Sequence, residues 1–381
     1  MTPPPNSPIQ PDSFGLSTLM SRRRLFALAG GAAILAACSD STDPPTAVSA
    51  VDASTTTDAT TTTTIAVTTT TVEATTTTTL PPPVQPLTGL PLTDPALLNR
   101  VALVVKVSND KGARPQTGLN DADIVYECWG AGPTRFAAVF HSRDRDFVGP
   151  IRSCREQDVN LVGSFNRAVF ACSGGNPGNI NLLRNSDLLL ITEGKGPGWE
   201  LDPNRRRPHK THADTAQLRT NALDRVGPEQ QFEYRAADAE PDAGDAMAGF
   251  DLQMQQVFVQ WRFDPVSGSY LRAHDGTPHM MEDGVQVSTE NVVIAWLDYE
   301  PSTTDRRSPD GRTTGTNSAV VFTGGKMITG TWTRADRLLP FTLTDAAGAP
   351  ILLKPGRTFF EMANGGKGSY GGNADTFTAI A

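Results

Sequence analysis

The sequence lacks the features that would tie the protein to a metal, a nucleic acid or a membrane-spanning helix. Only 4 of its 381 residues are cysteine, and there is no Cys-x-x-Cys pair and no His/Cys cluster with zinc spacing. We therefore expect neither a metal nor a cofactor. Basic residues are the minority, with 33 Lys and Arg against 41 Asp and Glu. This acidic balance argues against a nucleic acid partner, because phosphate binding needs a positive field.

Residues 1–38 have the pattern of a bacterial export signal. Arg22 and Arg23 lie in the order SRRRLF, which is typical of the twin-arginine type. The apolar stretch at 25–37 is shorter than the roughly 20 residues that span a membrane, and small residues follow it. The ending LAAC resembles a lipobox, so we predict that Cys38 is acylated and anchors the chain in the lipid bilayer outside the cytoplasm. An ordinary signal peptide with an accidental cysteine is the alternative, and Met20 is an alternative start.

Residues 39–84 differ sharply in composition from the rest. Runs of Thr dominate and end in three consecutive Pro residues, with few large apolar side chains. Such a segment cannot bury enough apolar surface to offset its chain entropy, so we predict a disordered stalk. A flexible coil of this length spans roughly 40 Å. The stalk would therefore hold a folded region away from the membrane.

The remaining residues predict an α+β fold in two parts. In the part at 85–235, four β-rich runs at 101–107, 122–129, 135–142 and 167–172 alternate with turns and helical patterns, so we expect a mixed α/β domain. Helices are expected at 156–164, 179–185 and 213–226. The part at 250–363 has short strands separated by Gly and Pro turns, which predicts a mostly antiparallel β domain. Residues 364–381 have the composition of a flexible tail.

Separated motifs in both parts resemble the YerB-like lipoproteins. They are PLTGLPL at 86–92, ARPQTGLNDADIVYE at 113–127, TRFAAVF at 134–140, GPIRSCR at 149–155, SGGN at 173–176, GGKMITGTW at 324–332 and GAPILLKPGRTFFEM at 348–362. The resemblance implies a membrane-tethered envelope lipoprotein with a two-part domain of unknown function, and it implies no reaction. The chain departs from the family pattern after Pro208-His209, where Lys210-Thr211-His212 replaces an Asn followed by Tyr.

The motifs in the first part place Arg residues at turns and strand ends. The candidate anion-binding residues are Arg114, Arg135, Arg152, Arg155 and His209. The planar guanidinium suits carboxylate or phosphate groups, and the backbone of Ser173, Gly174 and Gly175 could add N–H donors in a concave turn. The alternative is that Arg135 and Arg152 pair internally with Asp123, Glu127 or Asp158.

Two carboxylates and two thiols are further candidates. Asp123 and Glu127 could act as a general acid and base, as in glycoside hydrolysis, although Asp in a turn more often caps the backbone. Three cysteines remain after Cys38 is acylated, so one stays unpaired. We predict a disulfide between Cys154 and Cys172, whose loop would contribute roughly 3 kcal/mol, and a buried Cys128 thiol.

Two functions of different classes follow. The first is a non-catalytic module that binds an anionic cell-wall component or an envelope protein through its Arg residues. The second is a hydrolase or transferase that acts on cell-wall glycan through a carboxylate. Their geometries differ: an unpaired carboxylate in an open cleft favours the enzyme, and a buried carboxylate paired with Arg favours the binding module.

Overall fold

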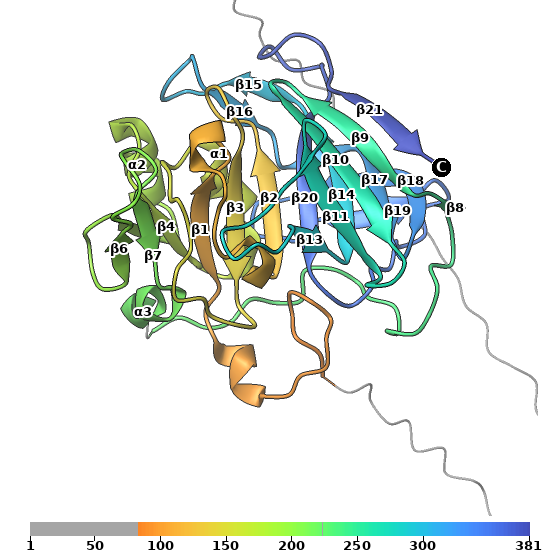
Figure 1. Ribbon diagram of the computed structural model, residues 1–381, viewed down its shortest axis with the longest axis horizontal. Coiled ribbons are helices and arrows are strands. Elements are labelled where there is room, and N and C mark those ends of the chain that lie inside the picture. Colours follow the sequence, from red (N-terminus) through yellow and green to blue (C-terminus); the bar gives the residue numbers. More distant parts are fainter. Residues whose placement is uncertain (1–82, 223) are drawn as a thin grey trace, which may run out of the picture. The chain divides into compact units, whose positions relative to one another are not determined.

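The structure is a computed structural model that describes residues 83–222 and 224–381 (Figure 1). The predicted export signal with Arg22 and Arg23, the acylation site Cys38 and nearly all of the predicted stalk lie outside the described residues. None of the helices in the described part is long and apolar enough to span a membrane.

The largest element is a mixed sheet that draws strands from both halves of the sequence. In spatial order its strands are β19 (Thr342–Asp345), β18 (Lys326–Arg334), β17 (Gly315–Thr323), β14 (Asn291–Leu297), β20 (Thr358–Asn364), β2 (Ile124–Cys128), β3 (Arg135–Phe140), β1 (Leu103–Ser108), β4 (Val169–Cys172) and β5 (Leu189–Thr192), with β8 (Asp245–Ala246) beside β18. The four strands predicted in the first half correspond to β1, β2, β3 and β4, because β-branched runs and turn residues bound each of them.

Strand β20 joins the two halves, and it pairs in parallel with β14 on one side and β2 on the other. This parallel pairing departs from the mostly antiparallel arrangement expected for the second half. Strands β1, β4 and β5 are parallel to one another, and β1 is parallel to β2 because both are antiparallel to β3. The carboxyl ends of β1, β2, β4, β5, β14 and β20 therefore lie along one edge of the sheet.

A second, antiparallel sheet packs on one face of the main sheet. Its strands are β12 (Thr277–Pro278), β11 (Ser269–His274), β10 (Val257–Asp264), β9 (Gly249–Met254) and β21 (Thr376–Ile380), with β13 (Ser288–Thr289) beside β11. The core between the sheets includes Val105 and Phe136 from the main sheet, and Phe250 and Trp261 from the second. The expectation of a loose tail at 364–381 is wrong, since β21 pairs with β9 along five residues.

Helices cover part of the opposite face of the main sheet. The α-helices are α1 (Gln157–Leu161), α2 (Pro177–Arg184) and α3 (Thr215–Arg219), and the 3-10 helices are Pro95–Asn99, Lys111–Ala113, Leu119–Asp121, Gly163–Phe165 and Thr220–Ala222. Leu161 of α1 and Leu183 of α2 belong to the core on this face, together with Val104 and Ala137. Leu218 of α3 belongs instead to the core between the two sheets. Two small hairpins complete the described elements: β6 (Trp199–Leu201) with β7 (Thr211–Ala213), and β15 (Tyr299–Pro301) with β16 (Pro309–Gly311).

The fold is richer in strands than the α+β class that we expected. The three helical patterns do form helices, but each α-helix is short, and only α2 reaches eight residues. Two of them continue as single 3-10 turns, at Gly163–Phe165 and Thr220–Ala222. The helices thus serve as short connections between strands, and the two sheets make up most of the fold.

Candidate functional site

The loops at the carboxyl edge of the parallel strands carry the predicted Arg residues. Arg135 is the first residue of β3, and it lies opposite Ser108 and Cys128, the last residues of β1 and β2. Arg152 follows Ile151, which forms a bridge with Val107 of β1. Ligands of open sheets with parallel strands bind at this edge. The sequence therefore folds so that two separate segments, the β2–β3 turn and the loop before α1, bring basic side chains to the position where such sheets hold ligands.

Arg135, Arg152 and Arg155 form a group that we call the arginine cluster. The Arg135 side chain is enclosed, with only 7% of the residue exposed. Burial, followed by the neighbouring charges of Arg155 and Arg152, lowers the pKa of Arg135 to about 9. Its Nη1 donates to Ser153 O at 3.4 Å, and Arg155 Nη1 donates to Cys154 O at 2.9 Å. Like charges thus lie side by side, and neutral carbonyl groups are their hydrogen-bond partners.

No carboxylate neutralises the arginine cluster by an ion pair in the part of the chain that the structure describes. The charge of Asp158 acts on Arg135 and Arg155 and partly offsets the lowering of their pKa values, but Asp158 forms its ion pair with Lys106, whose Nζ lies 2.6 Å from Asp158 Oδ1. The other oxygen of Asp158 accepts the backbone N–H of Arg155 at 2.7 Å. The alternative of internal pairing between these Arg residues and Asp123, Glu127 or Asp158 therefore does not describe the structure, because each carboxylate has other partners.

Asp123 directly precedes β2, where it binds the residues that follow the end of β3. One of its oxygens accepts the backbone N–H groups of His141 and Ser142, at 2.6 and 2.8 Å, and the other accepts the Ser142 hydroxyl. The residue is 1% exposed, and burial raises the pKa of its carboxyl group. Asp123 caps a turn and faces no open cleft, which is the structural interpretation of an Asp at that place.

Glu127 lies on the other face of β2 from the arginine cluster, between the two sheets. Its Oε1 accepts from Asn109 Nδ2 at 2.7 Å and from the Thr134 hydroxyl, and its Oε2 pairs with Arg272 of β11. Both Glu127 and Arg272 are fully buried. A carboxylate enclosed in this way cannot reach a substrate directly.

Around Glu127 the structure assembles a buried polar network of Glu127, Glu361, Arg272, His274 and His279. Glu361 of β20 accepts from Trp261 Nε1 at 2.8 Å and lies 3.5 Å from Arg272 Nε. Burial, with the charge of Glu127, raises the pKa of Glu361 well above its ordinary value. Arg272 thus lies between two buried carboxyl groups, Glu127 and Glu361.

The two histidines of the network, His274 and His279, are uncharged at neutral pH. Burial and the Arg272 charge lower the pKa values of His274 and His279 far below the ordinary range. Arg272 Nη1 donates to His279 Nδ1 at 2.8 Å and also contacts His274 Nε2. His279 Nε2 is 2.8 Å from Gln116 Oε1. Both histidines thus accept hydrogen bonds from the Arg272 guanidinium.

The remaining predicted residues divide between these two groups. Arg114 belongs with the network, because its Nη2 donates to Asn109 O at 3.1 Å and Asn109 in turn contacts Glu127. His209 lies beside Gly112, where an added Cβ would be 3.0 Å from His209 Nε2. Burial lowers the pKa of His209, and the Arg152 charge lowers it further. The structure therefore brings His209 toward the arginine cluster and separates Arg114 from it.

The predicted backbone donors and thiols border the cluster. The Ser173 N–H donates to Arg152 O at 3.1 Å, so this peptide group is already used within the protein. Cys128, Cys154 and Cys172 are buried free thiols. Cys154 and Cys172 are in hydrogen-bond contact, and this contact together with burial raises the pKa of Cys154. Their disulfide stays a prediction.

Comparison with known proteins identifies the family. The family described as "Protein of unknown function (DUF3048)" matches twice, by its N-terminal domain over residues 87–229 and by its C-terminal domain over residues 250–360. The chain belongs to the DUF3048 family. It is 29% identical over 291 residues to the protein named "Putative lipoprotein YerB" of Bacillus subtilis (strain 168), covering 73% of this chain and 85% of that protein.

The crystal structure of the YerB protein from Bacillus subtilis has the same fold as this DUF3048 member. The TM-score is 0.64 at 22% sequence identity, over 77% of this chain and 99% of that structure. The two family domains fall on either side of the connection at 230–249. In this chain they share the main sheet through the pairing of β2 with β20.

Sequence reasoning missed the residues that the second half of this DUF3048 member contributes. Strand β11 has an inverted pattern: Tyr270, Arg272 and His274 face inward and are buried, while Leu271 and Ala273 are partly exposed. Alternation of this kind at i, i+2 and i+4 is visible in the sequence SYLRAH.

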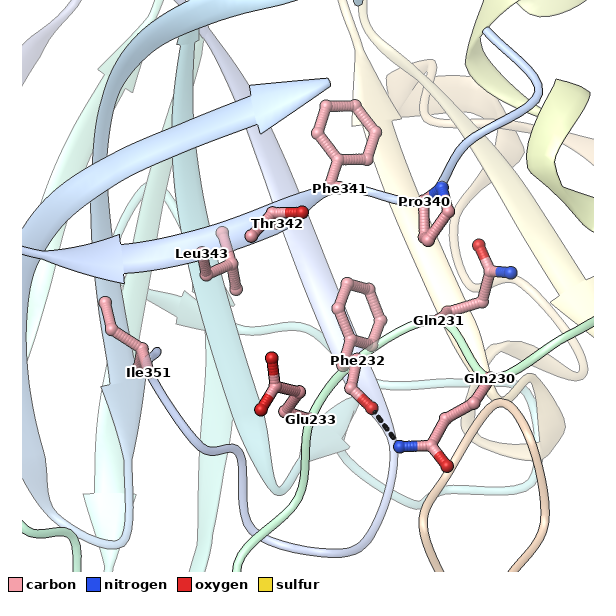
Figure 2. Close-up of a pocket in the computed structure, with 9 residues that line it drawn as sticks. All are labelled: Gln230, Gln231, Phe232, Glu233, Pro340, Phe341, Thr342, Leu343 and Ile351. Atoms are coloured by element: carbon pink, nitrogen blue, oxygen red, sulfur yellow. Dashed lines mark hydrogen bonds between the residues drawn. The ribbon is translucent and has the colours of Figure 1, made fainter. Parts of the chain in front are cut away.

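A small hollow elsewhere in the molecule contains none of these residues. Figure 2 shows it between Gln230–Glu233 and Pro340–Leu343, with Ile351 at one side. Its volume is about 160 Å³. Gln230 Nε2 donates to Phe232 O at 2.7 Å along its wall. Glu233 is its one ionisable lining residue, so the hollow has no group suited to an anion and is not the candidate site.

Proposed function

We propose that this protein is an envelope lipoprotein whose folded region binds an anionic component of the cell wall through the arginine cluster. Acylated Cys38 would hold the chain to the outer side of the membrane, and the Thr-rich stalk at 39–84 would let the folded region reach the wall. The YerB relative is named a putative lipoprotein, which supports the anchored location. An acidic surface of another envelope protein presents the same chemistry and is the second ligand to examine.

The observation that supports this function is the absence of a carboxylate partner for Arg135, Arg152 and Arg155 in the described ion pairs. Grouping like charges is unfavourable unless an opposite charge offsets it, and burial makes the repulsion larger. An anion that binds at the cluster would relieve this repulsion and form charge-assisted hydrogen bonds. The carboxyl edge of parallel strands is also where ligands of such sheets commonly bind.

The glycan hydrolase or transferase has less support. Its two candidate carboxylates, Asp123 and Glu127, are 1% and 0% exposed. Asp123 binds backbone N–H groups, and Glu127 is paired with Arg272. Both lie in the geometry that favours the binding module.

The test is co-sedimentation of a soluble form of the chain, residues 39–381 without the acylation site Cys38, with purified cell wall and with the same wall stripped of its anionic polymers. The wild type should bind the intact wall and lose most binding to the stripped wall. Arg152→Ala and Arg155→Ala should each weaken binding about tenfold, since a hydrogen bond to a charged group is worth roughly 1.5–3 kcal/mol. Raising the salt concentration should weaken binding as well.

The matched control is Arg184→Ala, because Arg184 is an exposed arginine at the end of α2 and outside the cluster. It should bind like the wild type. Equal binding by Arg152→Ala, Arg155→Ala and Arg184→Ala would contradict the assignment of the site. Capture of a soluble envelope protein by the wild type, lost in Arg152→Ala while wall binding is unchanged, would replace the wall with a protein ligand.

A further inference from the structure

A pocket of about 530 Å³ lies beside the buried network, between the loop that follows β1 and the turn from β11 to β12. We call it the His274 pocket. Its lining includes Lys111, Arg114, His274, Pro278, Met280 and Met281. The volume falls within the range of sites that bind small molecules. The arginine cluster contributes no residue to this lining, so the proposed wall-binding site does not include the pocket.

The hydrogen bonds of the network fix where the His274 proton lies. The guanidinium of Arg272 can only donate, so His274 Nε2 and His279 Nδ1 must both accept from its Nη1. In a neutral imidazole the other nitrogen then carries the proton. For His279 this proton is on Nε2, which donates to Gln116 Oε1 at 2.8 Å.

His274 has no equivalent partner. Its proton is on Nδ1, and this buried atom is without a hydrogen-bond partner in the described structure. The residue is 4% exposed, and it lines the pocket. A buried N–H group without an acceptor is unfavourable by roughly the amount of a lost hydrogen bond. A ligand acceptor that reaches this atom from the pocket would therefore form a hydrogen bond that the free protein lacks.

The rest of the lining favours an anion with an apolar portion. Arg114 and Lys111 supply two positive charges against the one carboxylate of Asp275. Arg114 donates through Nε and Nη2 to Asn109, at 3.3 and 3.1 Å, and it forms none of the described ion pairs. Met281 is buried, while Met280 is 40% exposed. Thioether side chains adapt well to flat or irregular apolar groups.

We propose that the His274 pocket binds a small organic anion. Its acidic group lies against Arg114 and Lys111, an acceptor atom takes the His274 Nδ1–H, and its apolar portion contacts Met280 and Met281. The bound molecule would be a carboxylate or phosphate ester of small-molecule size rather than a wall polymer. This ligand is additional to the one that we propose for the arginine cluster.

The test uses nitrogen NMR of the histidine side chains in the soluble form of the chain, residues 39–381. In the free protein, His274 should be the Nδ1–H tautomer and His279 the Nε2–H tautomer. Titration with benzoate or phenyl phosphate should shift the His274 nitrogen signals until saturation. Benzamide, which lacks the charge, and acetate, which lacks the ring, should shift them at least tenfold less at equal concentration.

Met280→Trp is the variant that blocks the pocket, and the exposure of Met280 makes it tolerable to the fold. It should abolish the shift, and Lys111→Ala should weaken binding several-fold. Leu338→Trp is the matched control, because Leu338 is 54% exposed and does not line this pocket. It should respond like the wild type.

Three results would overturn the proposal: no saturable shift with either aromatic anion, an equal shift in Met280→Trp, or an Nε2–H tautomer at His274. Arg152→Ala separates this proposal from the wall-binding function. This variant should lose wall binding and keep the benzoate response, so either site can fail while the other stands.

Discussion

At the scale of single residues, the interior of the protein contains an unusual number of ionisable groups. Lys106, Asp158, Glu127, Arg272 and Glu361 are each no more than 1% exposed. Pairing compensates for their loss of hydration only in part. Such groups specify which side chains face one another across the sheets, and they make the free energy of unfolding sensitive to pH.

Asp310 of β16 provides a pH-dependent prediction. Burial and the nearby charges of Glu156 and Asp158 raise its pKa to about 7, whereas an aspartate in an unfolded chain titrates near 3.9. The folded state thus retains a proton that the unfolded state gives up. The contribution of Asp310 to stability is fully present below about pH 4 and is lost as the pH rises toward 7.

The measurement is the free energy of unfolding by denaturant at a series of pH values. Asp310→Asn cannot lose a proton, so its stability relative to the wild type should increase between pH 4 and pH 7. Asp238→Asn, at an exposed position, is the control and should follow the wild type at every pH. Parallel curves for Asp310→Asn and the wild type would show that Asp310 titrates normally.

At the scale of elements, the success of sequence reasoning depended on how local each signal was. Strands β1 to β4 were predictable because each is an apolar run between turn residues. The convergence of Arg135, Arg152 and Arg155 was also predictable, since turns at the ends of neighbouring strands meet. The position of β20 between β14 and β2 was not, because no local pattern specifies a parallel partner more than 200 residues away.

The last strand, β21, is the element for which composition misled us. Gly-rich residues before it indicated a loose tail, yet Phe377 packs on Phe250, Phe322 and Trp296, with ring centroids 5.8, 6.2 and 6.0 Å away. Phe377→Ala should therefore lower the free energy of unfolding by about 2 kcal/mol, roughly half of the loss for a fully buried Phe.

Denaturant unfolding of Phe377→Ala beside Val266→Ala tests this contribution. Val266 is 94% exposed in a hairpin loop, so its replacement should change stability by less than about 0.5 kcal/mol. Indistinguishable midpoints for the two variants would mean that β21 does not hold the second sheet together in solution.

At the scale of the whole molecule, the two family domains share one sheet. The polar network also draws on both domains, because Glu127 comes from the first part while Arg272 and Glu361 come from the second. Residues 85–235 alone would lack Arg272 and leave the Glu127 carboxylate buried and unpaired. They would also expose the edge of β2, a site for aggregation.

We therefore predict that the parts at 85–235 and 236–381 do not fold separately, and that both together unfold in one transition. Circular dichroism and size-exclusion chromatography of each part, alone and coexpressed, provide the measurement. Coexpression should restore a soluble complex. Two separable thermal transitions in the intact chain, or a monomeric and well-ordered 85–235, would instead show that the parts are independent domains.

The position of β20 also has a consequence for biosynthesis. Strands β1 to β5 leave the ribosome well before residues 358–364, yet β2 has no neighbour on one side until β20 is made. The main sheet of the nascent chain is therefore incomplete, with one edge of β2 open, until translation is nearly finished. Chaperones that recognise exposed strands would have their longest opportunity during this interval, and a translational pause before residue 358 would lengthen it.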